Sequence, residues 1–322
     1  MVRTKLAAVL LGVLAVVGLV VVPAASATPF YRDVYMRDNA GDVGNEPSAG
    51  SIYTSPDIKV CWTPVPCAVS QNPRVGLNNY VFVTLRRKPG GIGNVDGNLV
   101  LYRSNLGGGT AWPGGWTYIN NIGASVPVGG TTVMLTWPGW NVPGPAHFCL
   151  LARWVSPNID PMTFAEGPNT QLNAQRNNNI VWRNVNSVRV FPDRPYWVTY
   201  TIGNPNPFDG RQSLILEQPE RPFAGRVTID LGQELTARWR AAGQKGAGLK
   251  QVGETQFQIV EPKLARLDGL ALKGEERIEI GLTFETDVEA EPAVLQVRQV
   301  DEREGDLGGA EYRINEKEND KE

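Results

Sequence analysis

The sequence predicts an all-β protein with two antiparallel β-sandwich domains. Short runs of β-branched and aromatic residues follow one another along most of the chain, and turn residues interrupt them at short intervals. The 35 glycines and 24 prolines are spread among these runs rather than gathered in one linker. A length of 322 residues is typical of two domains, and a helical period is present in one short segment only.

Residues 1–27 have the features of a cleavable signal peptide. Arg3 and Lys5 precede the apolar run 6–22, and three small residues before Thr28 form a signal-peptidase site. A retained membrane anchor is the alternative, because a run of this length lies at the lower limit of a membrane span. No cysteine follows the site, so we expect no lipid anchor. The mature chain is therefore expected to have no transmembrane segment and to be secreted, or to remain at the cell surface or in the periplasm.

The first sandwich is expected over residues 28–192. Its run Gly107-Gly108-Gly109 is interpreted as a turn. The Asn-rich stretch 169–186 is interpreted as loop and strand, with its amides bonded to backbone groups. Segments that have the composition of strands and end at turn residues lie at 79–85, 98–102, 131–137, 147–153, 179–182 and 187–190.

The strand pattern starts again after Pro192 and Pro195, which favours a domain boundary at 192 and a second sandwich over 193–314. Strands are expected there at 198–202, 214–216, 227–231 and 278–284, with a closing hairpin from 294–300 and 309–314.

One short helix is predicted in the second domain, over 233–242. Leu235 and Trp239 would share one face of it, and Gly243 could end it. The last segment, 315–322, contains no apolar residue and is predicted to be a disordered charged tail.

The charge of the two domains differs. Residues 28–192 carry 12 Lys and Arg against 8 Asp and Glu, a net charge of +4, whereas residues 193–322 carry 17 against 25, a net charge of −8. The positive charge of the first domain is not clustered on one segment. We therefore do not expect nucleic acid as a partner.

Five segments of the first domain have distinctive strand and loop signatures, at 55–58, 71–74, 79–83, 146–153 and 176–182. In this order they resemble the immunoglobulin-like β-sandwich modules of secreted bacterial proteins, such as the adhesion-type CARDB-like domains. The second domain is similar to the same modules more loosely. The resemblance implies an immunoglobulin-like fold and a location outside the cytoplasm, and it assigns no activity.

Residue types that carry catalysis are scarce. The only histidine is His147, and Cys149 would lie about 7 Å from it on the same face of a strand. That is too far for a nucleophile and its base, so we interpret His147 as a core residue and predict no catalytic residues. One histidine and three widely spaced cysteines match no zinc motif. No carboxylate pair of the glycosidase type stands out either.

Cys61 and Cys67 are predicted to form a disulfide that closes a small loop containing two prolines. A bond from either residue to Cys149 remains an alternative, as do three free thiols. With the first pairing, Cys149 would be left as a small buried side chain.

An acidic turn offers the one candidate metal site. Asp38, Asn39 and Asp42 lie around Gly41 and could supply oxygen ligands to Ca²⁺. Their spacing is not that of an EF-hand loop, and a solvated turn is the alternative. We predict no other cofactor.

Three tryptophans are candidate ligand-binding residues. Trp112, Trp116 and Trp140 lie in segments rich in Gly and Pro, where a ring can stay exposed. An exposed ring on a sandwich can stack on a sugar or fill a partner's pocket. Burial at the open end of the sandwich is the alternative.

Together these features predict a secreted, non-enzymatic β-sandwich protein that acts by binding, adhesion or extracellular assembly. Its partner would be an extracellular protein or a glycan. The alternatives are an accessory carbohydrate-binding module or a secreted hydrolase, for which a cleft with convergent titratable groups would be required. A further alternative is a scaffold protein whose exposed sheet edges pair with a partner.

Overall fold

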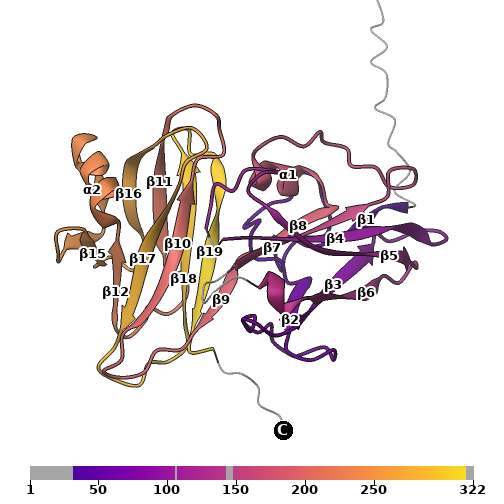
Figure 1. Ribbon diagram of the computed structural model, residues 1–322, viewed down its shortest axis with the longest axis horizontal. Coiled ribbons are helices and arrows are strands. Elements are labelled where there is room, and N and C mark those ends of the chain that lie inside the picture. The colour runs from indigo at the N-terminus through magenta and orange to yellow at the C-terminus, as the bar shows by residue number, and fades with distance from the viewer. Residues whose placement is uncertain (1–31, 106, 143–147, 317–322) are drawn as a thin grey trace, which may run out of the picture.

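The computed structural model describes residues 32–105, 107–142 and 148–316. The predicted signal peptide, His147 and residues 317–322 of the predicted tail lie outside these ranges. Within them the all-β prediction is confirmed, because four sheets form two sandwiches that stand side by side (Figure 1). No helix in the described ranges is long and apolar enough to cross a membrane.

The first sandwich packs two four-stranded sheets face to face. In one, β3 (Asn79–Arg87) pairs with β1 (Val34–Tyr35), β2 (Ile58–Cys61) and β6 (Thr131–Trp137). The other has the order β5 (Thr117–Val126), β4 (Val95–Asn105), β7 (Phe148–Val155) and β8 (Ile180–Arg183). Alternate residues of both sheets point inward and fill one core, in which Trp137 and Trp154 are fully buried.

The second sandwich packs a five-stranded sheet on a six-stranded one. The five strands are, in order, β10 (Tyr196–Gly203), β17 (Arg277–Glu285), β12 (Arg226–Asp230), β15 (Gln256–Ile259) and β14 (Leu249–Gln251). The six are β13 (Gly246–Ala247), β16 (Ala265–Leu272), β11 (Gly210–Glu217), β18 (Ala293–Asp301), β19 (Asp306–Ile314) and β9 (Val185–Val188). The predicted hairpin of β18 and β19 is confirmed, and β9 runs parallel to β19.

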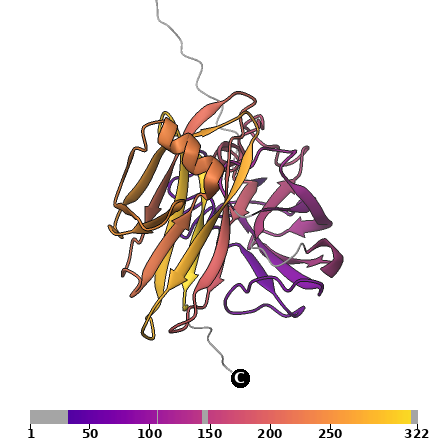
Figure 2. The ribbon, with the colours of Figure 1, turned by 60° about the vertical axis from the view of Figure 1, so that its left-hand side comes forward.

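Helix α2 (Gly232–Ala241) confirms the predicted helix to within one residue. Leu235 and Trp239 are buried on its inner face, as expected. The indole N–H of Trp239 donates to the carbonyl oxygens of Lys245 and Asp268, at 3.0 and 2.9 Å. The helix lies on the side of the second sandwich away from the first (Figures 1 and 2).

Helix α1 (Thr170–Arg176) corrects the interpretation of the Asn-rich stretch as loop and strand. The stretch lacks a helical period of apolar residues, so pattern analysis passes over it. The helix begins because Asn169 caps it, its Oδ1 accepting a hydrogen bond from Leu172 N at 3.1 Å. A 3₁₀ turn, η2 (Gly139–Asn141), is also additional to the predicted elements. So are seven strands: β1, β2, β5, β13, β14, β15 and β16.

Strand β9 precedes the predicted domain boundary at residue 192, yet it extends a sheet of the second sandwich. The chain also returns to this region at its other end. Asn315, the first residue of the predicted disordered tail, accepts a hydrogen bond from Val190 N at 2.8 Å. Its amide donates to the carbonyl oxygens of Val190 and Ala290. The segment around residue 190 is therefore bonded to the second sandwich, and Asn315 is held in the fold.

The segment Gly107–Gly109, expected to be a turn, joins the two sandwiches. The N–H of Gly108 donates to the carbonyl oxygen of Thr201 on β10, at 3.1 Å. The N–H of Gly109 donates to the carbonyl oxygen of Leu307 on β19, at 2.7 Å. We call this contact between Gly107–Gly109 and strands β10 and β19 the glycine seam.

Only glycine allows the backbones to approach this closely at the seam. A Cβ atom on Gly107 would lie 1.8 Å from the carbonyl oxygen of Thr201, and one on Gly109 would lie 1.9 Å from that of Gly203. Gly109 also has a φ angle of +61°, which favours glycine.

Buried side chains surround the seam and continue it into a shared core. The amide of Asn184 donates to the carbonyl oxygens of Gly107, at 3.1 Å, and Gly309. Tyr53 and Trp182 of the first sandwich belong to the same apolar cluster as the core of the second. The sandwiches are therefore one packed body.

We expect Gly109→Ala to lower the free energy of unfolding by about 3 kcal/mol or more, because its methyl group overlaps the oxygen of Gly203 in an unfavourable backbone conformation. Chemical denaturation followed by tryptophan fluorescence measures this. Gly114→Ala is the matched control, since nothing lies within 4 Å of a Cβ atom there. It should change the free energy by less than about 0.5 kcal/mol. Equal effects of the two substitutions would contradict a tightly packed seam.

Candidate binding groove between the sandwiches

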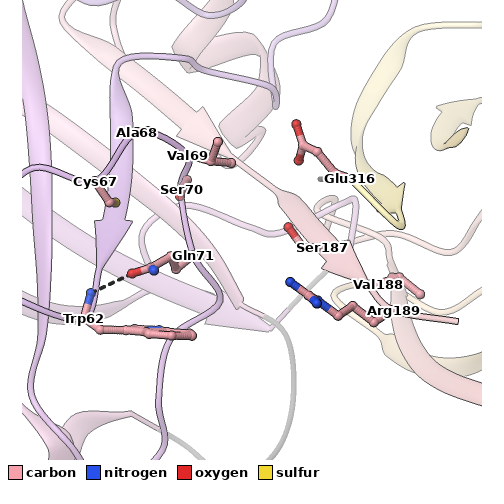
Figure 3. A pocket seen from close by; sticks show the side chains of 10 residues that line it. All are labelled: Trp62, Cys67, Ala68, Val69, Ser70, Gln71, Ser187, Val188, Arg189 and Glu316. Atoms are coloured by element: carbon pink, nitrogen blue, oxygen red, sulfur yellow. Dashed lines mark hydrogen bonds between the residues drawn. The ribbon is translucent and has the colours of Figure 1, made fainter. Parts of the chain in front are cut away.

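Two adjoining cavities lie between the sandwiches, where the loop after β2 faces β9 and β19. Their volumes are about 210 and 530 Å³, and residues 68–70 and Glu316 line both. We call the two together the groove. The smaller cavity holds Trp62, Gln71 and Ser187 in its wall. Figure 3 shows these side chains converging from the two sandwiches.

The indole of Trp62 is fixed in its place on the first wall of the groove. Its Nε1 donates to the carbonyl oxygen of Asn72 at 2.8 Å, and its backbone N–H donates to Oε1 of Gln71 at 2.9 Å. The guanidinium of Arg74 lies 3.8 Å from the centre of the ring. The ring is therefore oriented by the protein before any ligand arrives.

The disulfide between Cys61 and Cys67 holds this wall, as the sequence predicts. The disulfide closes the loop that follows β2. Cys61 directly precedes Trp62, and Cys67 lies at the edge of the groove. Cys149 is free and buried. Burial raises the pKa of its thiol to about 11, so it is a core residue without the reactivity of a thiolate.

Strand β9 forms the second wall and is bonded directly to the first. The amide of Asn72 donates to the carbonyl oxygen of Ser187 at 2.9 Å and accepts from its N–H at 3.3 Å. Arg189 follows β9, and its guanidinium extends toward Gln71 and Trp62 (Figure 3). An aromatic ring, a guanidinium and polar groups thus meet in one small cavity.

The charged side chains of the groove are mostly cationic. Arg313 pairs with Glu311 at 2.8 Å and with Glu316 at 3.1 Å. Arg183 is half-buried, and loss of solvent around its guanidinium lowers its pKa to about 10, which leaves it charged at neutral pH. Two acidic residues, Glu311 and Glu316, stand against four cationic ones, Lys59, Arg183, Arg189 and Arg313.

The three candidate ligand-binding tryptophans have different environments, and none lines either cavity. Trp116 is buried, and its Nε1 donates to Thr170 Oγ1 at 2.9 Å. Trp112 is half-buried, with the guanidinium of Arg153 4.6 Å from its ring centre. Trp140 is 84% exposed. Ligand binding by these residues stays a prediction.

The side-chain oxygens of the candidate calcium site are hydrogen-bonded to nearby residues, except that Asp38 Oδ1 is buried without a hydrogen-bond partner in the described chain. Asp42 accepts from the N–H of Asp38 and of Gly44, and Asn39 accepts from Gly41 N. Asp38 is buried and accepts from Ser48 Oγ. Burial raises the pKa of Asp38 well above its usual value, and the carboxylate of Asp42 adds to the rise.

In the described part of the chain, no three His, Cys, Asp or Glu side chains are grouped as metal ligands. Calcium binding at the Asp38 loop remains a prediction.

Outside the groove, Asp160 is a buried acid whose pKa is raised to about 7. Burial is the main cause, and the carboxylates of Asp33 and Glu46 contribute. Its Oδ2 accepts hydrogen bonds from Val34 N at 3.1 Å and from Asn179 Nδ2 at 2.8 Å. Asp160 thereby holds β1 against the start of β8, which is a role in the fold.

No protein-family model and no curated protein matches the chain. Among solved structures, the chain is similar to the CupB6 tip adhesin from Pseudomonas aeruginosa, at 8% sequence identity. The alignment covers 83% of this chain and 98% of that chain, with a TM-score of 0.17. A likeness at this level carries no argument about family or function.

The residues of the groove were missed by sequence analysis, apart from the disulfide. Trp62 lies inside the predicted disulfide loop, and that position was the one available signal. Ser187 and Arg189 lie more than a hundred positions further along the chain and have no motif. Only the pairing of β9 with β19 brings them opposite the loop.

Removing the disulfide should loosen the first wall of the groove. We expect the double substitution Cys61→Ser, Cys67→Ser to lower the free energy of unfolding by about 2 kcal/mol, from the chain entropy of a loop this short. Denaturation with and without dithiothreitol measures the effect. Cys149→Ala is the control, because it removes a thiol that forms no disulfide and should keep the full response to the reductant. A wild-type chain insensitive to reduction would contradict this expectation.

The stability of the protein should carry a pH-dependent contribution from Asp160. The unfolded carboxyl has a pKa of about 3.9, so between pH 4 and 7 the folded chain holds a proton that the unfolded chain releases. This contribution to the free energy of unfolding is fully present below pH 4 and is lost as the pH rises from 4 through 7. Asp160→Asn should therefore gain stability relative to wild type over this range, by up to about 4 kcal/mol. Urea denaturation between pH 4.5 and 8 measures the difference, and a difference independent of pH would refute the assignment.

Proposed function

We propose that this protein is a secreted, non-enzymatic binding protein that holds an extracellular glycan bearing carboxylate groups in the groove. The observation that carries the proposal is the pre-positioned indole of Trp62, with Arg189, Gln71 and Ser187 around the same cavity. The export features of the sequence and the disulfide support a site of action outside the cytoplasm.

The chemistry of the groove suits a sugar. The apolar face of an aromatic ring can stack on the C–H face of a pyranose, and amide and hydroxyl groups can form hydrogen bonds with the hydroxyls of the sugar. Gln71 and Ser187 provide such groups on opposite walls. Because the ring is already fixed by Asn72 and Arg74, little conformational freedom is lost on binding.

The excess of cationic side chains favours an acidic ligand. A guanidinium can bind a carboxylate through two parallel hydrogen bonds, and Arg189 is directed into the smaller cavity (Figure 3). The two glutamates of the groove are both bonded to Arg313. This arrangement supports binding rather than acid–base catalysis, which uses carboxyl groups that meet at one reacting bond.

The resemblance of the first domain implies an immunoglobulin-like fold outside the cytoplasm, and such a fold would suit this role. An accessory carbohydrate-binding module would bind a glycan in the same way, as part of a carbohydrate-active enzyme. The hydrolase alternative has no comparable support from the groove.

Calorimetric titration of the mature chain, residues 28–322, with neutral and uronate-containing oligosaccharides tests the proposal. We expect binding of the acidic sugars, and Trp62→Ala should weaken it by about tenfold through loss of the aromatic contact. Arg189→Gln should weaken binding of acidic but not of neutral sugars. Circular dichroism confirms that each variant is folded.

Trp140→Ala is the matched control, since it removes an exposed indole outside the groove. It should leave the affinity unchanged. Loss of binding in Trp140→Ala together with normal binding in the Trp62 and Arg189 variants would reject the groove and favour the exposed tryptophan. Absence of binding to every sugar would reject the glycan itself.

A further inference from the structure

A third cavity adjoins the groove on the side of the second sandwich. Its volume is about 600 Å³, and residues 189–192, 289–292, Asn315 and Glu316 line it. Arg189 and Glu316 also line the smaller cavity of the groove, so these two cavities share a border. Figure 3 shows both side chains at the edge of the smaller cavity. A ligand that fills the groove can therefore continue past Arg189 into the third cavity.

Asn315 fixes the two walls of the third cavity relative to each other. Its Oδ1 accepts a hydrogen bond from Val190 N at 2.8 Å. Its Nδ2 donates to the carbonyl oxygens of Val190 and Ala290, at 3.2 and 3.0 Å. Val190 and Ala290 are both buried, so the segments 189–192 and 289–292 are anchored on either side of this amide. The third cavity is therefore formed before a ligand arrives, as the groove is.

Phe191 gives the third cavity an aromatic surface. Its side chain is 56% exposed, although the residue directly follows the buried Val190. The face of an exposed phenyl ring can stack on the C–H face of a pyranose, as proposed for the indole of Trp62 in the groove. A sugar that covers the ring removes apolar surface from water, which favours binding.

The charge of the third cavity is opposite to that of the groove. Its lining has three acidic residues, Glu289, Glu291 and Glu316, and one cationic residue, Arg189. Carboxylates accept hydrogen bonds from the hydroxyls of an uncharged sugar, but they repel a sugar that itself carries a carboxylate. The third cavity therefore suits an uncharged sugar, whereas the groove suits an acidic one.

We propose that the bound glycan alternates in charge along its length. A sugar bearing a carboxylate lies in the groove against Arg189, and a neighbouring uncharged sugar stacks on Phe191 in the third cavity. This inference rests on the proposed function, because one glycan chain occupies both places. It adds a specificity to that function: a glycan in which every sugar is acidic is repelled by Glu289 and Glu291.

Calorimetric titration of the mature chain with two tetrasaccharides of equal length tests the proposal. In one, uronate and N-acetylhexosamine alternate, and the other consists of uronate alone. We expect the alternating sugar to bind at least about tenfold more tightly. Long-range attraction to the cationic groove would give the reverse order, because the uronate sugar carries the larger charge.

Substitution of the aromatic residue locates the uncharged sugar. Phe191→Ala should weaken binding of the alternating tetrasaccharide by about tenfold and leave the affinity for the uronate tetrasaccharide unchanged. Phe208→Ala is the matched control, because Phe208 is 77% exposed and lines none of the three cavities. It should change neither affinity. Circular dichroism confirms that each variant is folded.

Removal of the acidic groups tests the repulsion separately. The double substitution Glu289→Gln, Glu291→Gln should strengthen binding of the uronate tetrasaccharide several-fold and change binding of the alternating one little. The control Glu220→Gln, Glu261→Gln removes two exposed carboxylates outside the three cavities and should strengthen neither.

The possible outcomes separate this inference from the proposed function. Equal binding of the two tetrasaccharides, or tighter binding of the uronate one, overturns the inference and leaves the groove as a glycan site. So does an affinity for the alternating sugar that Phe191→Ala and Phe208→Ala change equally. Failure of every sugar to bind rejects the proposed function, and the inference with it.

Discussion

Two carbonyl oxygens of strand β10, those of Thr201 and Gly203, occupy the space that side chains on Gly107 and Gly109 would need. This close backbone approach sets the distance between the sandwiches. It allows Gly108 and Gly109 to donate hydrogen bonds to both sheets of the second sandwich. With the backbones at this distance, the rings of Tyr53 and Trp182 reach the core of the partner sandwich and bury apolar surface there. The amide of Asn184 then satisfies the carbonyl groups that burial would leave unpaired.

The groove depends on the same contact. Its walls belong to different sandwiches, so their separation is fixed by the seam and by the bonds between Asn72 and Ser187. On one side, the disulfide and Arg74 hold Trp62 in a single orientation. On the other, β9 is held by its pairing with β19. A ligand therefore meets walls that are already in position, and a rigid site loses less entropy on binding than a mobile one.

The sequence by itself determined the features that depend on neighbours along the chain. The alternation of Val198, Tyr200 and Ile202 predicts a strand, and the spacing of Leu235 and Trp239 predicts helix α2, because both periods are local. The short loop between Cys61 and Cys67 predicts their disulfide for the same reason. Helix α1 was not predicted, because a cap at Asn169 stabilises it without a clear apolar period. Strands β1, β2, β5 and β13 to β16 were not predicted either, because pairing with neighbouring strands stabilises them.

Only the tertiary structure decided where the sandwiches meet and what the groove contains. A run of three glycines is compatible with any turn, and its role appears only when Thr201 and Leu307, distant in sequence, come within hydrogen-bond distance. Likewise, no sequence motif marks Ser187 as a residue of the groove. Its place there becomes apparent only when β9 joins the sheet of the second sandwich. Local patterns specify which segments become strands, but the order of strands in a sheet depends on packing between residues far apart in the chain.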